Sequence, residues 1–351
     1  MSATVLQEAL QKVLAGRDLT AAEAERAMDA IMSGEATPAQ VAGYLVALRM
    51  KGETPAEIAG SARAMRRHAT PVVTRRQGVL DTWGTGGDGS HTFNISTVAA
   101  IVVAAAGVPV AKHGNRSVSS RCGSADVLEA LGVVLDLDAA ALGRCLDEIG
   151  LAFLFAPRLH RAMRHAAGPR RELGVRTIFN LLGPLTNPAG ARYQLLGVYA
   201  ADLVEPVARV LADLGVERAL VVHGEPGIDE MSVCGSTLIG RVEAGQVRLQ
   251  RVEPADAGLP VYPAGALAGG DPARNAAIAR QVLAGEPGAY RDAVLLNAAG
   301  ALVAAGRVGD LREGVDLAAR AIDSGAAAAK LEEWVRLTRR LAGAPVEEAA
   351  G

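Results

Sequence analysis

Residues 81–97, which read DTWGTGGDGSHTFNIST, hold the first group of residues that could do chemistry. Four glycines fall within six positions after an apolar stretch, and a second apolar segment follows, with Ser96 and Thr97 at its start. A glycine loop between a strand and a helix lets backbone N–H groups approach an anion, and the positive end of the helix favours the same charge. The stretch therefore predicts a phosphate-binding loop, and the plain alternative is a tight turn before a capped helix.

The spacing of Gly84, Gly86 and Gly89 fits the pattern Gly-x-Gly-x-x-Gly, which several nucleotide-binding loops share. A dinucleotide site also requires an acidic residue about twenty positions later, where this chain has Lys112. A P-loop is excluded as well, because no Gly-Lys-Ser or Gly-Lys-Thr follows. Lys112 instead brings a positive charge to the end of the neighbouring predicted strand, where it suits a bound phosphate.

Two further polar segments follow predicted strands. Residues 111–126, AKHGNRSVSSRCGSAD, place His113, Asn115 and several hydroxyl groups directly after the second strand, although a solvated loop would look similar. Asp229 and Glu230 are adjacent acids in the turn HGEPGIDEMS. Carboxylate oxygens that leave room for water suit Mg²⁺ bound jointly with substrate phosphates, whereas paired acids are also common on exposed loops.

The composition limits the class of protein. The chain has 351 residues, of which 50% are hydrophobic and 3% aromatic, and its formal net charge is −2. A broad basic surface for nucleic acid is therefore not indicated. The three cysteines lie far apart without zinc-like spacing, which is typical of thiols in a reducing compartment. We find no signal peptide or membrane-spanning run, and we expect a cytoplasmic protein without a membrane partner.

Helix signals dominate the first seventy residues. Threonine followed three positions later by Glu or Gln, the pattern of a capping box, occurs at Thr20, Thr37 and Thr54, and an additional helix is expected at residues 4–15. The rest alternates strand and helix patterns, except for a basic and Pro/Gly-rich segment at 158–190 that is expected to pack against the N-terminal helices. We therefore predict an α/β protein, in which a small helical N-terminal domain precedes a larger α/β domain with a mainly parallel central sheet covered by helices.

Four motifs in this order resemble those of the anthranilate phosphoribosyltransferase family, within the superfamily that also contains class II nucleoside phosphorylases: GTGGDG..TFNIST, KHGNRSVSS.CGSADVLEALG, RTIFNLLGPLTNPA and GIDE. The resemblance covers nearly the whole chain. It implies transfer of the phosphoribosyl group from phosphoribosyl pyrophosphate (PRPP) to the amine of anthranilate in tryptophan biosynthesis. It also implies a helical domain of residues 1–72 and 168–190, an α/β domain of residues 73–167 and 191–351, and a homodimer formed through the helical domain.

The resemblance implies roles for individual residues as well. The residues expected to bind PRPP are Gly84, Gly86, Gly87, Asp88, Asn94, Ser96, Thr97, Lys112 and Ser119. The residues expected to bind anthranilate are His113, Asn115, His160, Arg170, Gly183 and Pro184. Ser96, Asp229 and Glu230 are expected to hold Mg²⁺, with two ions per active site bound together with PRPP. Arg170 is expected to pair with the anthranilate carboxylate, because a planar guanidinium matches it bidentately. The resemblance implies no obligate general base. If a side chain acts as one, His113 is the candidate.

Two positions depart from the family pattern, and both lie in the anthranilate half of the site. Arg161 stands where the family often has Pro, and Pro169 precedes Arg170 where the family often has Val. Two alternatives are kept. A pyrimidine nucleoside phosphorylase-like enzyme is disfavoured because the Asp229–Glu230 pair suits PRPP and metal. A nucleic-acid-binding paralogue without the activity is disfavoured by the near-neutral charge, so no nucleic-acid partner is expected.

Overall fold

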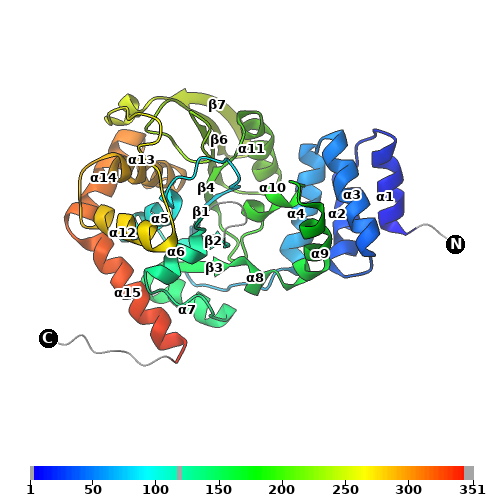
Figure 1. Ribbon diagram of the computed structural model, residues 1–351, viewed down its shortest axis with the longest axis horizontal. Coiled ribbons are helices and arrows are strands. Elements are labelled where there is room, and N and C mark those ends of the chain that lie inside the picture. The colour runs from blue at the N-terminus through cyan, green and yellow to red at the C-terminus, as the bar shows by residue number, and fades with distance from the viewer. Residues whose placement is uncertain (1–3, 117–120, 344–351) are drawn as a thin grey trace.

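The structure is a computed structural model that describes residues 4–116 and 121–343. A helical bundle at the N-terminal end is joined to a larger α/β body, and the two ends of the chain lie at opposite extremes of the molecule (Figure 1). In the described part of the chain, no helix combines the length and the apolar character needed to cross a membrane.

Four helices form the N-terminal bundle, in agreement with the prediction. They are α1 (Val5–Leu14), α2 (Ala21–Met32), α3 (Pro38–Lys51) and α4 (Pro55–His68). The capping boxes predicted at Thr20, Thr37 and Thr54 are all formed, and Thr4 makes a further one. In each box the threonine hydroxyl and the longer side chain satisfy backbone N–H groups that the helix leaves free.

A seven-stranded sheet forms the centre of the α/β body. Its order across the sheet is β3 (Leu151–Phe155), β2 (Val110–Gly114), β1 (Leu80–Gly84), β4 (Tyr193–Gly197), β5 (Arg218–Gly224), β6 (Thr237–Glu243) and β7 (Gln246–Val252). The first five strands are parallel, whereas β6 and β7 pair antiparallel at one edge. The predicted α/β class with a mainly parallel sheet is confirmed.

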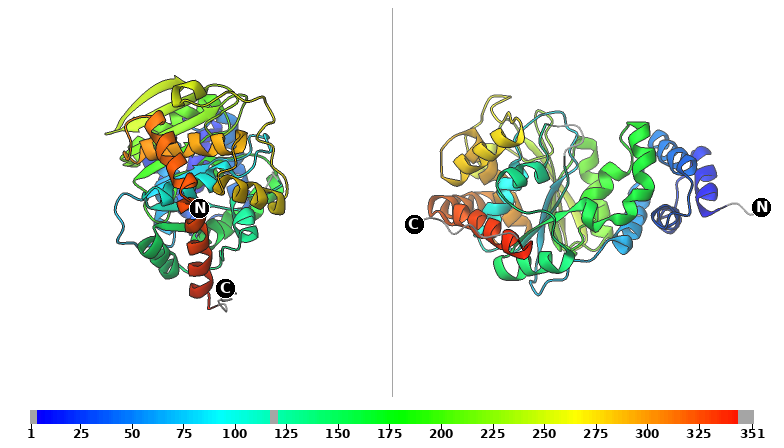
Figure 2. Two further views of the ribbon diagram at one scale, coloured as in Figure 1. Left: turned by 90° about the vertical axis from the view of Figure 1, so that its left-hand side faces the viewer. Right: turned by 60° about the horizontal axis from the view of Figure 1, so that its bottom comes forward.

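Helices cover both faces of this sheet, as Figure 2 shows in its edge-on view. One face carries a core built with α5 (Ile95–Ala105), α6 (Ser124–Ala130), α7 (Ala139–Ile149), α12 (Pro272–Leu283), α13 (Ala289–Ala304), α14 (Leu311–Asp323) and α15 (Ala326–Leu341). The other face carries α11 (Val204–Asp213), and its core continues into the N-terminal bundle. Short 3₁₀ turns lie at Arg161–Met163, Gly183–Leu185, Ala201–Leu203 and Pro254–Ala257.

The segment between β3 and β4 leaves the α/β body and packs against the bundle. It contains α8 (Ala156–Leu159), α9 (Arg164–Leu173) and α10 (Phe179–Leu182). Helix α9 contacts α2 and α3, and α10 contacts α4. Pro169 lies inside α9, which continues around it to Leu173 and ends at Gly174, a residue in the left-handed region. The segment therefore brings residues 160–190 to the junction of the bundle and the sheet.

Candidate active site

The glycine loop follows β1 and is shaped by a nearby acidic side chain. Gly86 has φ of +64°, a conformation that side chains other than glycine rarely adopt. A Cβ atom built on Gly84 would stand 2.9 Å from Cγ of Asp229, so the close approach of the two segments needs glycine at this position. A cavity of about 270 Å³ opens on the side of the loop formed by Asp88 and Ser90. The loop thus offers bare backbone at the carboxyl edge of the sheet.

The acid pair after β5 lies against this loop and against the start of α5. The N–H of Gly86 donates to Oδ2 of Asp229 at 2.6 Å, and the N–H of Ser96 donates to Oε1 of Glu230 at 3.1 Å. The backbone N–H of Asp229 in turn donates to Oδ2 of Asp88 at 3.3 Å. The loop and the first turn of α5 therefore already direct backbone donors at anionic oxygens, which is the property that a phosphate site requires.

The carboxyl groups of Asp229 and Glu230 lie close to one another and are desolvated by the surrounding protein. Desolvation, followed by repulsion from Asp88, raises the pKa of Asp229 to about 7. Desolvation, followed by repulsion from Asp229, raises the pKa of Glu230 to about 8. Lys112, only 1% exposed, points its Nζ at the Thr82 carbonyl. Burial lowers the pKa of Lys112, while the surrounding carboxylates favour its charged form.

The carboxylate oxygens of Asp229 and Glu230, beside the glycine loop, suit a hard divalent cation as ligands. Asp229 and Glu230 are neighbours, and nearby positive charge does not fully balance their two negative charges. A bound cation would stabilise the ionised forms, and carboxylate oxygens are the ligands that Mg²⁺ prefers. Within residues 4–116 and 121–343, no group of three His, Cys, Asp or Glu side chains is arranged to hold a metal ion by itself. Asp229 and Glu230 therefore suit an ion that completes its coordination with water and substrate oxygens.

The remaining predicted PRPP residues lie at the start of α5. The hydroxyl of Ser96 accepts from Nζ of Lys112 at 3.3 Å, and Thr97 is buried in the first turn of the helix. The Asn94 side chain is committed to protein partners, because its Nδ2 donates to the Cys122 carbonyl and its Oδ1 accepts from Asn275. Ser119, also predicted to bind PRPP, lies outside the described residues.

Aromatic and histidine rings gather on the face of β2 opposite to Lys112 and form what we call the His113 wall. Lys112 and His113 are consecutive, so their side chains point to opposite faces of the strand. The His113 ring meets the indole of Trp83 edge-on, with ring centroids 4.0 Å apart, and lies 4.9 Å from the ring of His160. Gly183 packs against the same indole, since a Cβ there would stand 3.3 Å from Cη2 of Trp83. Four residues from distant segments therefore surround one spot.

Both histidines of this wall are neutral near pH 7. Burial lowers the pKa of His113 well below its usual value and the pKa of His160 to about 4. Within residues 4–116 and 121–343, neither ring nitrogen of His113 makes a hydrogen bond of normal geometry, although the nearby backbone of Gly183 favours the protonated ring. Nε2 of His160 has no partner among these residues either. Buried unpaired nitrogens are costly, and a polar ligand would satisfy them.

Arg170 lies on α9 and faces Phe179, the first residue of α10. It is half-buried, whereas its neighbour Arg171 is exposed. Its guanidinium carbon stands 4.9 Å from the ring centroid of Phe179, and burial lowers its pKa. Within the described part of the chain, no carboxylate pairs with Arg170, although most other half-buried arginines there have a polar partner. The exposed Arg161, the other departure from the family pattern, lies in a 3₁₀ turn.

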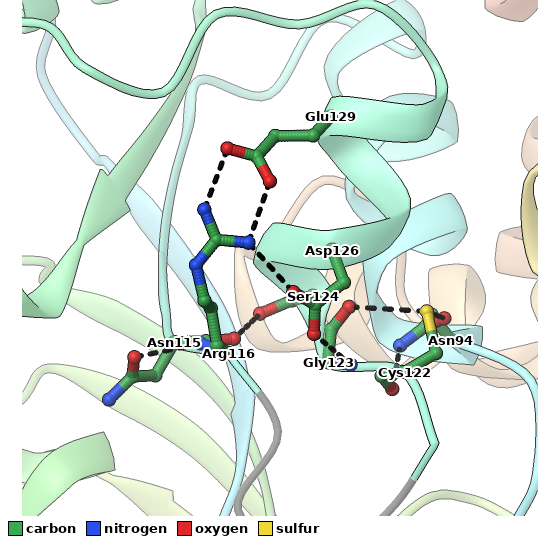
Figure 3. A network of polar contacts seen from close by, with 8 residues as sticks. All are labelled: Asn94, Asn115, Arg116, Cys122, Gly123, Ser124, Asp126 and Glu129. Atoms are coloured by element: carbon green, nitrogen blue, oxygen red, sulfur yellow. Dashed lines mark hydrogen bonds and ion pairs between the residues drawn. The ribbon is translucent and has the colours of Figure 1, made fainter. Parts of the chain in front are cut away.

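The loop after β2 is anchored at both ends, as Figure 3 shows. Arg116 binds Glu129 through two hydrogen bonds and also reaches Asp126. The carbonyl of Asn115 accepts from the Ser124 hydroxyl. Among the described residues, its exposed side chain accepts only from the next backbone N–H, and no acceptor there takes its amide nitrogen.

Asp81 and Asn187, which sequence reasoning did not single out, connect the two halves. Both are buried, and Nδ2 of Asn187 donates to Oδ2 of Asp81 and to the Ala111 carbonyl, each at 2.8 Å. Oδ1 of Asp81 accepts from the backbone N–H of His113 at 3.0 Å. An acid in the middle of a buried strand was the available signal, because buried charges require partners. Pro184 is held nearby, since its carbonyl accepts from Gln194.

Two family descriptions match the chain. Residues 7–69 match the helical bundle domain of a glycosyl transferase family, and residues 76–328 match its a/b domain. The anthranilate phosphoribosyltransferase of Moorella thermoacetica is 60% identical over 331 residues, which cover 94% of this chain and 98% of the relative. That of Symbiobacterium thermophilum is 58% identical over 332 residues, covering 95% and 97%.

Solved structures agree with these relatives. The anthranilate phosphoribosyltransferase of Thermus thermophilus superposes with a TM-score of 0.90 at 50% identity, covering 94% of this chain and 99% of that one. The Saccharomyces cerevisiae enzyme in complex with PRPP and Mg gives 0.88 at 29% identity, covering 97% and 99%. The same yeast enzyme in complex with 4-fluoroanthranilate gives 0.86 at 28% identity, covering 95% and 98%. The chain therefore belongs to the anthranilate phosphoribosyltransferase family.

Proposed function

We propose that the chain transfers the phosphoribosyl group of PRPP to the amine of anthranilate, forming N-(5-phosphoribosyl)anthranilate and releasing pyrophosphate. Breaking the bond between the anomeric carbon and pyrophosphate builds positive charge on the sugar and negative charge on the leaving group. The protein has to stabilise the second and to place the amine against the first. Bound PRPP and Mg in the yeast enzyme support the donor half of this proposal.

On the donor side, the glycine loop binds the pyrophosphate of PRPP. The N–H groups of Gly86 and Ser96, which now donate to carboxylates, turn to phosphate oxygens, and Lys112 adds a full positive charge. The predicted contacts of Gly84, Gly87, Asp88, Asn94, Thr97 and Ser119 are retained in this proposal. Asp229 and Glu230, assisted by Ser96, hold two Mg²⁺ ions per site, which neutralise the leaving pyrophosphate when bound.

On the acceptor side, Arg170 binds the carboxylate of anthranilate. The observation that carries this assignment is a half-buried guanidinium over the Phe179 ring that no carboxylate of the described chain neutralises. A bidentate pair with a planar carboxylate satisfies it. His113, His160, Gly183 and Pro184 form the wall along the ring, and Asn115 supplies a free amide. The 4-fluoroanthranilate bound to the yeast enzyme supports an acceptor of this class.

Positioning, and not a strong base, supplies most of the acceleration. The aromatic amine is already neutral at pH 7, so it needs no deprotonation before attack. His113 is the candidate to accept its proton afterwards, because burial keeps the ring neutral and neither nitrogen has a hydrogen-bond partner in the described part of the chain. Holding amine and anomeric carbon together can account for several kcal/mol of the barrier, up to about 7–11 kcal/mol in well-oriented systems.

The proposal also covers the two domains of the chain and the dimer that it forms. Residues 1–72 and 168–190 form the helical domain, with the packing of α9 and α10 on the bundle as support, and residues 73–167 and 191–351 form the α/β domain. Two copies associate through the helical domain, where Leu14 and Met50 are 70% and 83% exposed. The enzyme acts in the cytoplasm, and sedimentation of the purified chain tests the dimer.

An anthranilate fluorescence assay tests the reaction. Wild-type chain, PRPP, anthranilate and Mg²⁺ should give loss of anthranilate fluorescence and a product whose mass equals anthranilate plus the phosphoribosyl group. Parallel reactions with a pyrimidine nucleoside and phosphate test the phosphorylase alternative, and a DNA mobility shift at varied salt tests the nucleic-acid alternative. Phosphorolysis or salt-dependent DNA binding, without consumption of anthranilate, would replace this proposal by one of those.

A further inference from the structure

Trp83 occupies the junction between the donor loop and the acceptor wall, and nothing in the motifs gives it a role. It is the fourth residue of β1 and directly precedes Gly84, the first glycine of the loop. Its indole turns to the side of the sheet where the His113 ring lies, which is the acceptor side. A residue at this point is next to the place where the anomeric carbon and the amine have to meet.

The indole is packed on two sides and open on another. His113 contacts it edge-on at 4.0 Å between centroids, and the missing side chain of Gly183 leaves room for it. Trp83 nevertheless keeps partial solvent exposure, unlike Trp334, the other tryptophan of the chain, which is 1% exposed in α15. The indole N–H donates to no acceptor within the described residues, so packing alone holds the ring in place.

An aromatic ring with these surroundings suits an aromatic ligand. We propose that Trp83 is a specificity-determining residue of the acceptor pocket: the aromatic ring of the amine substrate packs against its indole, and the indole limits the size of the ring that the pocket admits. Aromatic pairs prefer offset or edge contacts and contribute beyond the area that they bury. This inference rests on the proposed function and adds to it which anthranilates the site accepts.

Gly183 provides a direct way to test the position of the indole, because it packs against the Trp83 ring. A methyl group at Gly183 would stand 3.3 Å from Cη2 and 3.4 Å from Cζ2 of Trp83, so the ring would have to move by a few tenths of an ångström. The backbone of Gly183 is right-handed helical, with φ of −50°, and alanine adopts that conformation without strain. The Gly183→Ala change therefore leaves the backbone unstrained, and the double variant with Trp83→Phe separates an effect through the indole from a direct effect on the substrate.

Kinetics of four variants test the proposal: Trp83→Val, Trp83→Phe, Gly183→Ala and the double variant Trp83→Phe/Gly183→Ala. Trp83→Val should raise KM for anthranilate about three- to tenfold, the range expected for a lost aromatic contact, and change KM for PRPP less than about twofold. Its kcat/KM for methyl- or methoxy-substituted anthranilates, relative to anthranilate, should rise about tenfold or more at one or more ring positions. Gly183→Ala should raise KM for anthranilate, and Trp83→Phe should remove that effect in the double variant, because the shorter ring no longer meets the methyl group.

Trp334→Phe is the matched control, since it removes the only other indole at a distant site. Protein labelled with 5-fluorotryptophan should give two ¹⁹F resonances, assigned by the two Trp→Phe variants, and only that of Trp83 should shift when anthranilate is added. A stable Trp83→Phe chain keeps the test valid if Trp83→Val does not fold. Two results from an active wild type would overturn this inference and leave the proposed function standing. One is a Trp83 resonance that does not shift with anthranilate, and the other is a set of variants that keep the wild-type preference among substituted anthranilates. A wild type that consumes no anthranilate overturns the proposed function, and the inference with it.

Discussion

The side-chain amide of Asn187 donates a hydrogen bond of 2.8 Å to the carboxylate of Asp81, and both side chains are buried. The other oxygen of that carboxylate accepts from the backbone of His113, at the end of β2. Burial raises the pKa of Asp81 to about 6, and these hydrogen bonds oppose the rise. One buried contact thus fastens the segment that carries Gly183 to the two strands that carry the donor and acceptor residues.

Replacing Asn187 by Ala should weaken both the fold and acceptor binding. A buried carboxylate oxygen would lose its donor, which costs about 1–3 kcal/mol, and urea unfolding would show the loss. KM for anthranilate should rise more than KM for PRPP, because Gly183 of the same segment packs against Trp83 beside the His113 ring. Glu172→Ala, at an exposed position of α9, serves as control and should change neither quantity. Unchanged stability of the Asn187 variant would contradict the account of this contact.

Local signals in the sequence predicted much of the fold. The capping boxes located three helices of the bundle, and strand–helix alternation located β1, β2, β4 and β5 together with α5, α6 and α11. Strand β3 and the β6–β7 hairpin were not predicted. The two-residue turn of the hairpin has both Ala244 and Gly245 at positive φ, and alanine is an unusual residue for that turn. Strand β7 is an exposed edge with polar residues, so its sequence lacks the apolar run that marks a buried strand.

The motifs also pointed to the donor side of the site, because its residues lie in short loops that directly follow β1, β2 and β5 at one edge of the sheet. The acceptor pocket is harder to derive, since His113, His160, Arg170 and Gly183 come from four segments that only the packing of the 160–190 segment brings close. The resemblance to a family, and not spacing, suggested them. Asp81 and Trp83 were read as parts of a short buried strand, because periodicity identifies a face as buried without saying what covers it.

The acid pair should control the requirement for Mg²⁺. Asp229→Asn with Glu230→Gln keeps the shape of both side chains and removes their charge, so turnover at ordinary Mg²⁺ should be lost while the circular dichroism spectrum stays that of the wild type. Asp213→Asn, an exposed acid at the end of α11, is the control. Full activity of the double variant would rule out the metal assignment.

The same pair predicts a pH dependence for Mg²⁺. Its pKa values are raised to about 7 and about 8, so protons compete with the cation at and below neutral pH. The Mg²⁺ concentration for half-maximal rate should therefore fall as pH rises from about 6 to about 8. A requirement that stayed constant over that window would mean that these carboxylates are already ionised in the free enzyme.

Gly86→Ala should weaken binding of PRPP more than binding of anthranilate. Alanine at a φ of +64° costs about 1–2 kcal/mol, and its methyl group would block the approach of a phosphate to the backbone. Calorimetry with each ligand in turn measures the difference. Gly43→Ala, inside α3 with only ordinary contacts around it, is the matched control and should bind both ligands as the wild type does. Equal loss for both ligands in the Gly86 variant would indicate general misfolding.

Arg170 and Arg171 should differ sharply although they are neighbours. Arg170→Ala removes the half-buried guanidinium that we propose binds the substrate carboxylate, and such a loss typically costs ~2–5 kcal/mol, or roughly 30-fold to several thousand-fold in affinity. KM for anthranilate should show it, and KM for PRPP should not. Arg171 is exposed, so Arg171→Ala should cost less than about tenfold. The reverse order would mean that Pro169 has shifted the register of α9 and that Arg171 binds the acceptor.

We propose that one site joins the residues that bind PRPP to an aromatic pocket for the acceptor, and the stoichiometry of the reaction tests this arrangement. Anthranilate fluorescence and released pyrophosphate are followed together in one mixture of enzyme, PRPP, anthranilate and Mg²⁺. We expect one pyrophosphate for each anthranilate consumed, and no release when anthranilate is omitted. Pyrophosphate released at the same rate without anthranilate would contradict it, because the site would then split PRPP without an acceptor pocket taking part.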